Sequence, residues 1–359
     1  MKGKTILLAS AAAVMVAMSA APASASDWWE STKISGRMYY DITNIDAKRA
    51  GVDSTSNGVS FDIKRFYVGI DHKFNDIFSA DVTTDFTYDS TVGATQVYIK
   101  KAYLEANLSP MLDIRLGSTD LPWVPFVEGI NGYRYVEHVL IDRAKFGTSA
   151  DWGVHLKGKF ANGVIQYAIS AVNGAGYKKP IRTNGVDFEG RLSAHFKGVT
   201  LAVGGYTGKL GTAHGTSTHH TATRFDALAA YTANGVRVGF EYFKANNWYQ
   251  VKSTAGDSAD GYSVFASYQF SPEWGVFGRY DWVNPSNDIH PDLQETFYNF
   301  GIAYTPYKMV DFALVYKHDK ATNGYWKTEN GTIGGLAFVS GAMGEGDYDE
   351  VGIFARLRW

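Results

Sequence analysis

Apolar and polar side chains alternate along the last nine residues of the chain. One parity holds Val351, Ile353, Ala355, Leu357 and Trp359, and the other holds Gly352, Phe354, Arg356 and Arg358. Because successive side chains of a β-strand point to opposite faces, this order predicts a strand with one apolar face and one face that carries both arginines. Such a strand is typical of a sheet with lipid on one side and water on the other.

The same two-residue alternation recurs along the rest of the chain, in about sixteen segments. Short turns such as Asn162-Gly163 and Asn234-Gly235 have the composition of tight hairpins. Longer polar, glycine-rich segments lie between them, at 44–60, 89–95, 119–148, 173–185, 208–222, 245–260, 284–294 and 319–347. The sequence therefore predicts an all-β fold: a transmembrane antiparallel β-barrel of about 16 strands, with short periplasmic turns and long extracellular loops.

The apolar parity of the predicted strands is nearly free of charge, which argues against a soluble sandwich of alternating strands. One residue departs from the rule, because Lys100 stands on the apolar parity. A lysine that faces the middle of a bilayer costs about 2–4 kcal/mol. We therefore expect a β-bulge or a change of phase around 99–101.

The N-terminus has the three regions of a secretory signal peptide. Lys2 and Lys4 precede an apolar run at 6–18, and the small residues Ala23-Ser24-Ala25 follow it. The run is shorter than the roughly 20 residues that a spanning helix needs, which disfavours the alternative of a membrane anchor. We predict a signal peptide at 1–25 and a single barrel domain at 26–359.

The composition limits the possible chemistry. The chain has no cysteine, so disulfides, zinc–thiolate sites and cysteine nucleophiles are excluded. Its formal net charge is −2, and loss of the two lysines of the predicted signal peptide makes it −4, which argues against nucleic acid as a partner. After the signal peptide no segment resembles a membrane-spanning helix, so only a closed barrel could cross a membrane.

The polar parity of the predicted strands carries many charges of both signs. A packed core would not accept so many ions, because each buried, unpaired charge costs several kcal/mol. A lumen filled with water accepts them at little cost, and a barrel of this size is too wide for side chains to fill. The predicted pore-lining residues are Arg37, Arg65, Lys101, Arg115, Arg191, Arg279, Asp81 and Asp113.

The segment 119–148 follows the fifth predicted strand and is too long for a simple connection. Its apolar residues argue against disorder, and we expect it to fold into the lumen and to narrow it. The charged residues that would then face a passing solute are Asp120, Glu128, Arg134, Glu137, Asp142 and Arg143, together with His138 and Lys145. The alternative is a loop packed on the outer mouth of the barrel.

The chain resembles the Gram-negative outer-membrane porins, in particular the phosphate-selective porin O and P family. The resemblance rests on strand patterns in the first half of the chain, which begin at Arg37, Lys64, Lys101 and Asp113, and loosely on the last strand. It implies a trimeric channel of sixteen strands in the outer membrane of a Gram-negative bacterium, with an inward third loop and a ladder of pore arginines. Arg37, Arg65, Arg115, Arg191 and Arg279 are candidates for that ladder.

These features predict a water-filled porin for passive diffusion of small hydrophilic solutes and ions, without cofactor, catalytic site or metal. Nearly as many acids as bases point inward, which argues against strict phosphate selectivity. An anion- or phosphate-selective channel is therefore only the first alternative. A barrel enzyme of the outer membrane is the second, because His155 and His195 also point inward. A structural or adhesive barrel with a plugged lumen is the third. His214, His219 and His220 share one loop, but without nearby carboxylates a solvated loop explains them better than a metal site.

Overall fold

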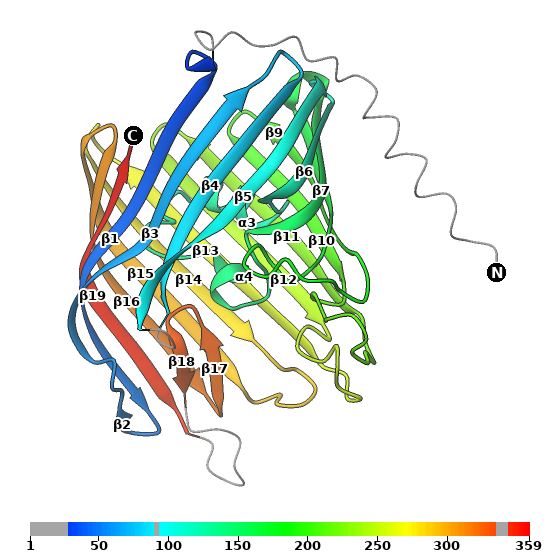
Figure 1. Ribbon diagram of the computed structural model, residues 1–359. Coiled ribbons are helices and arrows are strands. Elements are labelled where there is room, and N and C mark those ends of the chain that lie inside the picture. The colour runs from blue at the N-terminus through cyan, green and yellow to red at the C-terminus, as the bar shows by residue number, and fades with distance from the viewer. Residues whose placement is uncertain (1–27, 90–92, 335–343) are drawn as a thin grey trace.

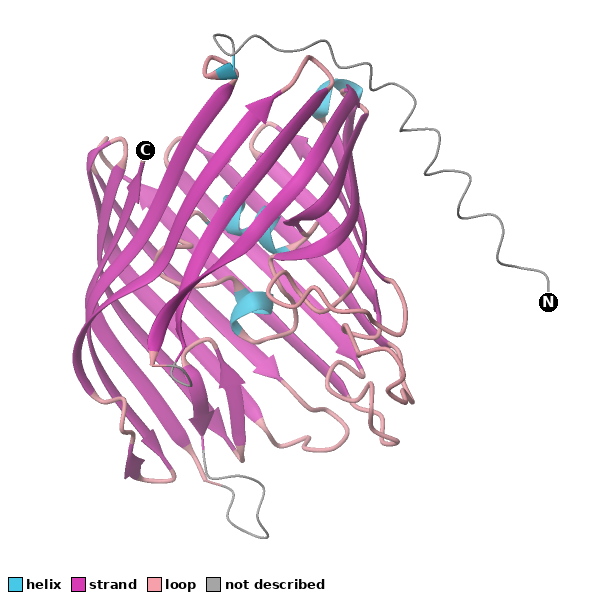
Figure 2. Cartoon of the chain, viewed as in Figure 1, coloured by secondary structure: helices cyan, strands magenta, loops and turns pink. Residues whose placement is uncertain are grey.

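Sixteen antiparallel strands close into one barrel in the computed structural model, which describes residues 28–89, 93–334 and 344–359 (Figures 1 and 2). Each barrel strand pairs with its neighbours in the chain. The barrel closes where β1 pairs with β19, in a register that runs from Arg37 opposite Arg358 to Arg49 opposite Gly346. The predicted fold and strand number are confirmed. The predicted signal peptide at 1–25 lies outside the described residues.

The barrel strands are β1 (Thr32–Arg49), β3 (Gly58–Lys73), β4 (Phe78–Asp89), β5 (Ala94–Ser109), β6 (Leu112–Asp120), β7 (Ala150–Phe160), β8 (Ile165–Val172), β9 (Asp187–Phe196), β10 (Val199–Gly208), β11 (Ala222–Ala233), β12 (Val236–Asn246), β13 (Ser258–Gln269), β14 (Trp274–Asn284), β15 (Gln294–Tyr307), β16 (Val310–Thr322) and β19 (Gly346–Arg358). The short strand β2 (Val52–Asp53) pairs with β1, and β17 (Tyr325–Thr328) pairs with β18 (Gly331–Gly334) in a separate hairpin. The helices are α3 (Val124–Asn131), α4 (Leu140–Arg143) and a 3-10 turn at Ala161–Gly163. Within the described ranges, none of them is both long and apolar enough to span a bilayer.

The two faces of the wall differ as the alternation predicts. On β14, Trp274, Val276 and Tyr280 are 40–43% exposed on the outside, whereas Phe277 and Arg279 are 7% exposed on the inside. Large aromatic residues lie on the outer face next to the short turns: Phe74, Phe160, Phe196, Phe270, Trp274 and Trp359. Amphipathic and aromatic side chains at this height fit the interface of a bilayer.

The short turns and the long loops lie at opposite rims of the barrel (Figure 1). Asn234 and Gly235, between β11 and β12, have φ values of 53° and 77°, and this pair of positive angles is the reason for the Asn-Gly sequence. The loop predicted at 44–60 is shorter, because β1 continues to Arg49 and β3 begins at Gly58. The start of β3 does alternate at Val59, Phe61 and Ile63, but on the parity opposite to that of Phe66, because Lys64 is an extra residue. The hairpin β17–β18 within 319–347 was not predicted, because each of its strands has only four residues; residues 335–343 of that segment lie outside the described ones.

Two of the four register shifts among the described barrel strands are β-bulges on neighbouring hairpins. Between β4 and β5, Thr83 pairs with Lys101 and Thr84 pairs with Ile99, so Lys100 is an extra residue, and the irregularity predicted at 99–101 is confirmed. Between β1 and β3, Tyr39 pairs with Arg65 and Tyr40 with Ile63, so Lys64 is extra in the same way. A bulge changes which parity points inward, and here it allows two consecutive residues to face the lumen.

The segment 121–149, which contains α3 and α4, lies inside the barrel (Figure 1). Its apolar residues, among them Trp123, Ile141 and Phe146, pack against Leu228 and Phe243 on the inner wall. Burial of a large apolar side chain stabilises by about 1.5–3 kcal/mol, so this contact holds the segment inside rather than on the outer mouth. The alternative of a loop on the outer mouth is wrong. The segment covers the inner side of β10–β16 and also contacts β19 and β1, and a cavity remains between it and β3 and β5.

Candidate functional site

Hydrogen bonds fix the start of the inward segment. The indole N–H of Trp123 donates to the Glu241 carboxylate at 2.9 Å, and the backbone N–H of the same residue donates to Glu189 at 2.9 Å. The Trp123 ring also lies against Gly204, where an added Cβ would be 2.5 Å from it. Trp123 is fully buried, so the position of α3 is set by the barrel wall.

A buried ion cluster fixes the end of the segment. The Arg143 guanidinium contacts three carboxylates on consecutive strands: Asp281 at 3.0 Å, Glu295 at 2.5 Å and Asp319 at 3.2 Å. All four side chains are 0% exposed. We predicted that Arg143 faces the solute, and that is wrong: three inward acids of the wall attract the guanidinium away from the lumen. Arg143 anchors α4.

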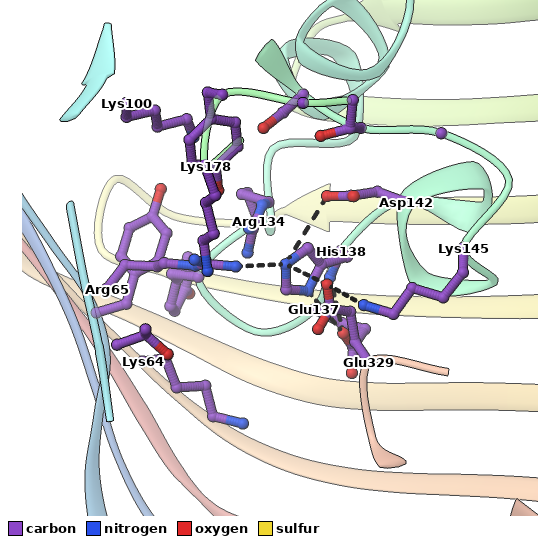
Figure 3. Close-up of a pocket in the computed structure, with 18 of the residues that line it drawn as sticks. Lys64, Arg65, Lys100, Arg134, Glu137, His138, Asp142, Lys145, Lys178 and Glu329 are labelled. Carbon is purple, nitrogen blue, oxygen red and sulfur yellow. Dashed lines mark hydrogen bonds and ion pairs between the residues drawn. The ribbon is translucent and has the colours of Figure 1, made fainter. Parts of the chain in front are cut away.

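A cavity of about 600 Å³ lies between the inward segment and the wall (Figure 3). Seven lysine and arginine side chains and four carboxylates line it, so its lining is net positive. Lys64, Arg65 and Lys100 come from β3 and β5, and Lys178 comes from the loop between β8 and β9. Opposite them in Figure 3 lie Glu137 and Asp142 of the inward segment and Glu329 of the β17–β18 hairpin.

The bulges supply two of these cations. Lys64 would face lipid in a regular strand, but its Nζ lies 3.0 Å from Asp41 and 3.6 Å from Glu350 on the inner side of the wall. Lys100 likewise turns inward, and its Nζ donates to the Tyr67 hydroxyl at 3.3 Å. The irregularity at Lys100 was predicted from its position on the apolar parity, whereas that at Lys64 was not. The signal was present, because the apolar parity changes between Ile63 and Phe66.

His138 lies at the centre of the cavity between charges of both signs. Burial, together with the nearby Arg134 guanidinium, lowers the pKa of His138 to about 3, so the ring is neutral at pH 7. The contacts fit one tautomer, in which Nδ1–H donates to Glu137 at 3.3 Å and Nε2 accepts from Arg65 at 3.1 Å. The approaches of His138 to Asp142 and Glu329 are therefore not ion pairs at neutral pH.

The carboxylates beside His138 differ in their pKa values. Burial raises the pKa of Asp142 to about 6, against the opposing charge of Arg134, and Glu128 and Glu329 add to the rise. Burial also disfavours the charge of Glu329, but His138, once it is protonated at low pH, and Lys145 outweigh burial and hold the pKa of Glu329 at about 2. The Lys145 ammonium is 2.6 Å from that carboxylate. Of these two carboxylates, Asp142 is the one whose charge changes near neutral pH.

The predicted residues separate into groups. Arg65, Arg134, Glu137 and Asp142 line the cavity, as do His138 and Lys145. Other predicted residues form pairs on the wall: Lys101 with Asp120 at 2.5 Å, and Arg115 with Glu105 at 3.3 Å. Asp113 lies 3.0 Å from Lys157, Glu128 lies 2.5 Å from Arg134, Arg37 donates to the Tyr39 hydroxyl at 3.4 Å, and Asp81 accepts from Thr83 at 3.1 Å.

Two predicted pore arginines contact the inward segment instead of open water. The Arg191 guanidinium lies 3.7 Å from the centre of the Phe126 ring and donates to the Pro122 carbonyl at 2.9 Å. Arg279 donates to the His138 carbonyl and pairs with Asp281. Both arginines point inward as expected, but they hold the inward segment by contacts with Phe126, Pro122 and His138. Lys178 and Glu329, which line the cavity, were missed because they belong to loops whose position depends on the closed barrel.

Candidates for catalysis and for a metal give little support to other chemistry. His155 lies 2.8 Å from the Ser170 hydroxyl, but its second ring nitrogen faces the Gly117 carbonyl at 3.3 Å, and Ser170 is 2% exposed. A Ser–His pair needs access to substrate and a group that orients the imidazole. Within the described parts of the chain, no group of three or more His, Asp or Glu side chains is arranged to hold a metal ion.

A closed barrel with an apolar outer face, a charged inner face and a segment folded into its lumen defines an outer-membrane channel. The model of the Gram-negative porin family matches residues 9–324, and the chain belongs to that family, as the resemblance implied. It therefore resides in the outer membrane of a Gram-negative bacterium.

Solved structures share the fold at low sequence identity. The anion-selective porin from Comamonas acidovorans is 12% identical with a TM-score of 0.64, and the alignment covers 92% of this chain and 99% of that one. OmpT of Vibrio cholerae is 13% identical with a TM-score of 0.61, with coverage of 91% and 97%. OmpF of Salmonella typhi, solved with daunomycin, is 11% identical with a TM-score of 0.55, with coverage of 91% and 97%. None of the curated protein sequences is similar enough to count as a relative.

Proposed function

We propose that the chain is a porin through which small hydrophilic solutes and ions diffuse passively, and that it makes or breaks no bond. The observation that carries this proposal is the cavity of about 600 Å³ beside the inward segment, which charged side chains of both signs line. A segment that is anchored on one wall and leaves charged space at the other supports a narrowed aqueous path. The pore-lining and constriction residues act on solutes through their charge and size.

Planar-bilayer recording tests this proposal. Purified, refolded protein should give stepwise, ohmic conductance in potassium chloride, with weak selectivity. Refolded protein that gives no conductance, although it migrates as a folded barrel on a gel, would favour a plugged lumen. Liposome swelling with sugars of increasing size then measures the width that the inward segment leaves.

An anion preference is the second candidate, because seven cationic and four anionic side chains line the cavity. Carboxylates on the inner face of the wall reduce this excess of positive charge, since Lys64 pairs with Asp41 and Arg65 pairs with Asp85. The preference should therefore be modest. Zero-current potentials in a chloride gradient measure it, and block of chloride current by phosphate in the low millimolar range would instead support the phosphate-selective alternative.

The absence of an enzymatic role is part of the proposal. The buried position of Ser170 and the contact of the second His155 ring nitrogen with the Gly117 carbonyl support it. The Ser170→Ala variant should conduct as the wild type does. Ester or peptide hydrolysis by the purified barrel that Ser170→Ala removes would overturn this part.

We also propose that the mature chain is a homotrimer that begins near residue 26. One of the similar structures is described as the trimer form of OmpT of Vibrio cholerae, which supports the oligomeric state. Mass spectrometry of the protein from outer membranes should give the mass without residues 1–25, and light scattering in detergent should give three copies per particle.

A further inference from the structure

Three of the seven cations that line the cavity, Lys100, Lys178 and Lys179, form no ion pair within the described residues, and the first two of them contact tyrosine rings. Lys64 lies 3.0 Å from Asp41, and Arg65 lies 3.1 Å from Asp85. Lys100 and Lys178, by contrast, form no ion pair with a carboxylate of the described residues. Lys100 comes from β5 and Lys178 from the β8–β9 loop, and both lie on the same side of the cavity in Figure 3. No carboxylate of the described residues is in contact with either ammonium group, although Asp120 acts on Lys100, and Asp85 and Glu329 act on Lys178, at longer range.

Tyrosine rings take the place of the missing carboxylates. The Lys100 Nζ lies 4.7 Å from the centre of the Tyr67 ring and 5.8 Å from that of Tyr177, and the Lys178 Nζ lies 4.4 Å from that of Tyr98. The rings of Tyr98 and Tyr177 stack at 5.9 Å with 29° between their planes. A cation–π contact positions an ammonium group without cancelling its charge, so both lysines stay available to an anion.

Tyr177 holds its position through its backbone. Its carbonyl accepts from the Trp152 indole at 2.8 Å, and its N–H donates to the Ala150 carbonyl at 3.1 Å. Tyr177 lines the cavity, where the Lys100 ammonium lies over its ring, whereas Tyr67 and Tyr98 contact the lysines without belonging to the lining. A planar apolar group could lie against this ring, and aromatic pairs gain about 0.5–1.5 kcal/mol beyond the burial of their area.

The far side of the cavity restricts the ligand further. Glu137, Asp142 and Glu329 lie there, and Lys145 pairs with the last of them. A second anionic group at that end of a ligand would meet like charge. A ligand with one anionic end and an uncharged planar body fits both sides.

We infer that the cavity is a binding site for small aromatic monocarboxylates, in which the carboxylate lies between Lys100 and Lys178 and the ring lies against Tyr177. The inference rests on the proposed channel function and assigns a class of solute to it. A site on the diffusion path raises the local concentration of such solutes and lets them pass faster than their size alone would allow.

Isothermal titration calorimetry on the detergent-solubilised protein tests the site with benzoate as the probe. Acetate, cyclohexanecarboxylate, the dianion terephthalate and inorganic phosphate serve as comparisons. Benzoate should bind about tenfold more tightly than acetate and than terephthalate. Equal affinity for benzoate, acetate and cyclohexanecarboxylate, or tighter binding of phosphate, would overturn the inference.

Variants of the lysines and of Tyr177 test which residues bind benzoate. The double variant Lys100→Met/Lys178→Met should weaken benzoate binding about tenfold or more, because charge-assisted contacts are lost. Lys157→Met is the matched control, since it also removes a lysine charge from the lumen, but this lysine pairs with Asp113 and contacts no tyrosine of the cavity. Tyr177→Leu should weaken binding of benzoate but not of acetate, and Tyr177→Phe should retain it. A double variant that is folded by gel mobility and binds benzoate as the wild type does would also overturn the inference.

Conductance separates this inference from the proposed function. Wild-type protein that conducts but binds no benzoate overturns the inference and leaves the porin function intact. Protein that binds benzoate but does not conduct overturns the function while the site stands. The two measurements can thus fail independently.

Discussion

Arg143 offers the sharpest test of how the lumen is narrowed. Exchange of Arg143 for methionine removes the cation from a cluster that is 0% exposed. Asp281 keeps Arg279 as a partner, but Glu295 and Asp319 lose the one lysine or arginine that pairs with them among the described residues. Removal of one member of a buried ion pair costs about 3–5 kcal/mol. This cost falls on the state in which α4 is docked on the wall.

A penalty of this size raises the population of the undocked segment by about a hundredfold or more. The Arg143→Met channel should therefore show a larger mean single-channel conductance and more frequent current fluctuations than the wild type, with a lower thermal midpoint. Arg143→Lys, which keeps a buried charge, should lie between the two. Arg134→Met is the matched control, because Arg134 lines the cavity and its loss should change selectivity more than conductance. An Arg143→Met channel with wild-type conductance and only a shifted zero-current potential would refute the anchoring role.

Three further predictions concern charge and assembly. Exchange of both bulge lysines, Lys64 and Lys100, for methionine removes two luminal charges and should shift the zero-current potential towards potassium permeability; an unchanged potential would remove them from the selectivity determinants. Since burial raises the pKa of Asp142 to about 6, its carboxyl is neutral below that pH and charged above it. The preference of the channel for anions should therefore rise as the pH falls from about 8 to about 5. Asp142→Asn should flatten this pH dependence, and a variant with the same pH dependence as the wild type would assign the titration to another group. An added Cβ at Gly36 would lie 1.9 Å from the Trp359 ring, so Gly36→Val should hinder closure of β1 on β19 and reduce the heat-modifiable folded form on gels, and a normal yield would contradict this.

The residues of the candidate site show where prediction from the sequence succeeds. Lys100 was expected to lie at a bulge because it breaks an otherwise apolar parity, and the register confirms it. The same test, applied to the change of parity between Ile63 and Phe66, would have found Lys64. Both signals are local, because a strand that crosses lipid must keep its charges on one side.

Other features of the site could not be read locally. Arg143 and Asp319 are 176 residues apart in the chain, and their contact exists only because the barrel closes and α4 reaches the inside of β16. Lys178 and Glu329 meet the cavity from separate long loops, in which no alternation marks an inner face. A charged residue in such a loop has the same sequence signature whether it faces solute, solvent or a buried partner.

The sequence by itself determined the barrel and most of its lipid-facing and lumen-facing residues, since both follow from a two-residue period, and it left the inward position of segment 119–148 as one of two alternatives. Only the tertiary structure decided which charges neutralise one another and which remain free. The physical reason is that hydrophobic alternation is imposed residue by residue by the bilayer. Ion pairing depends instead on distances of 3–4 Å across the lumen, and these are fixed only when sixteen strands have closed and the inward segment has docked.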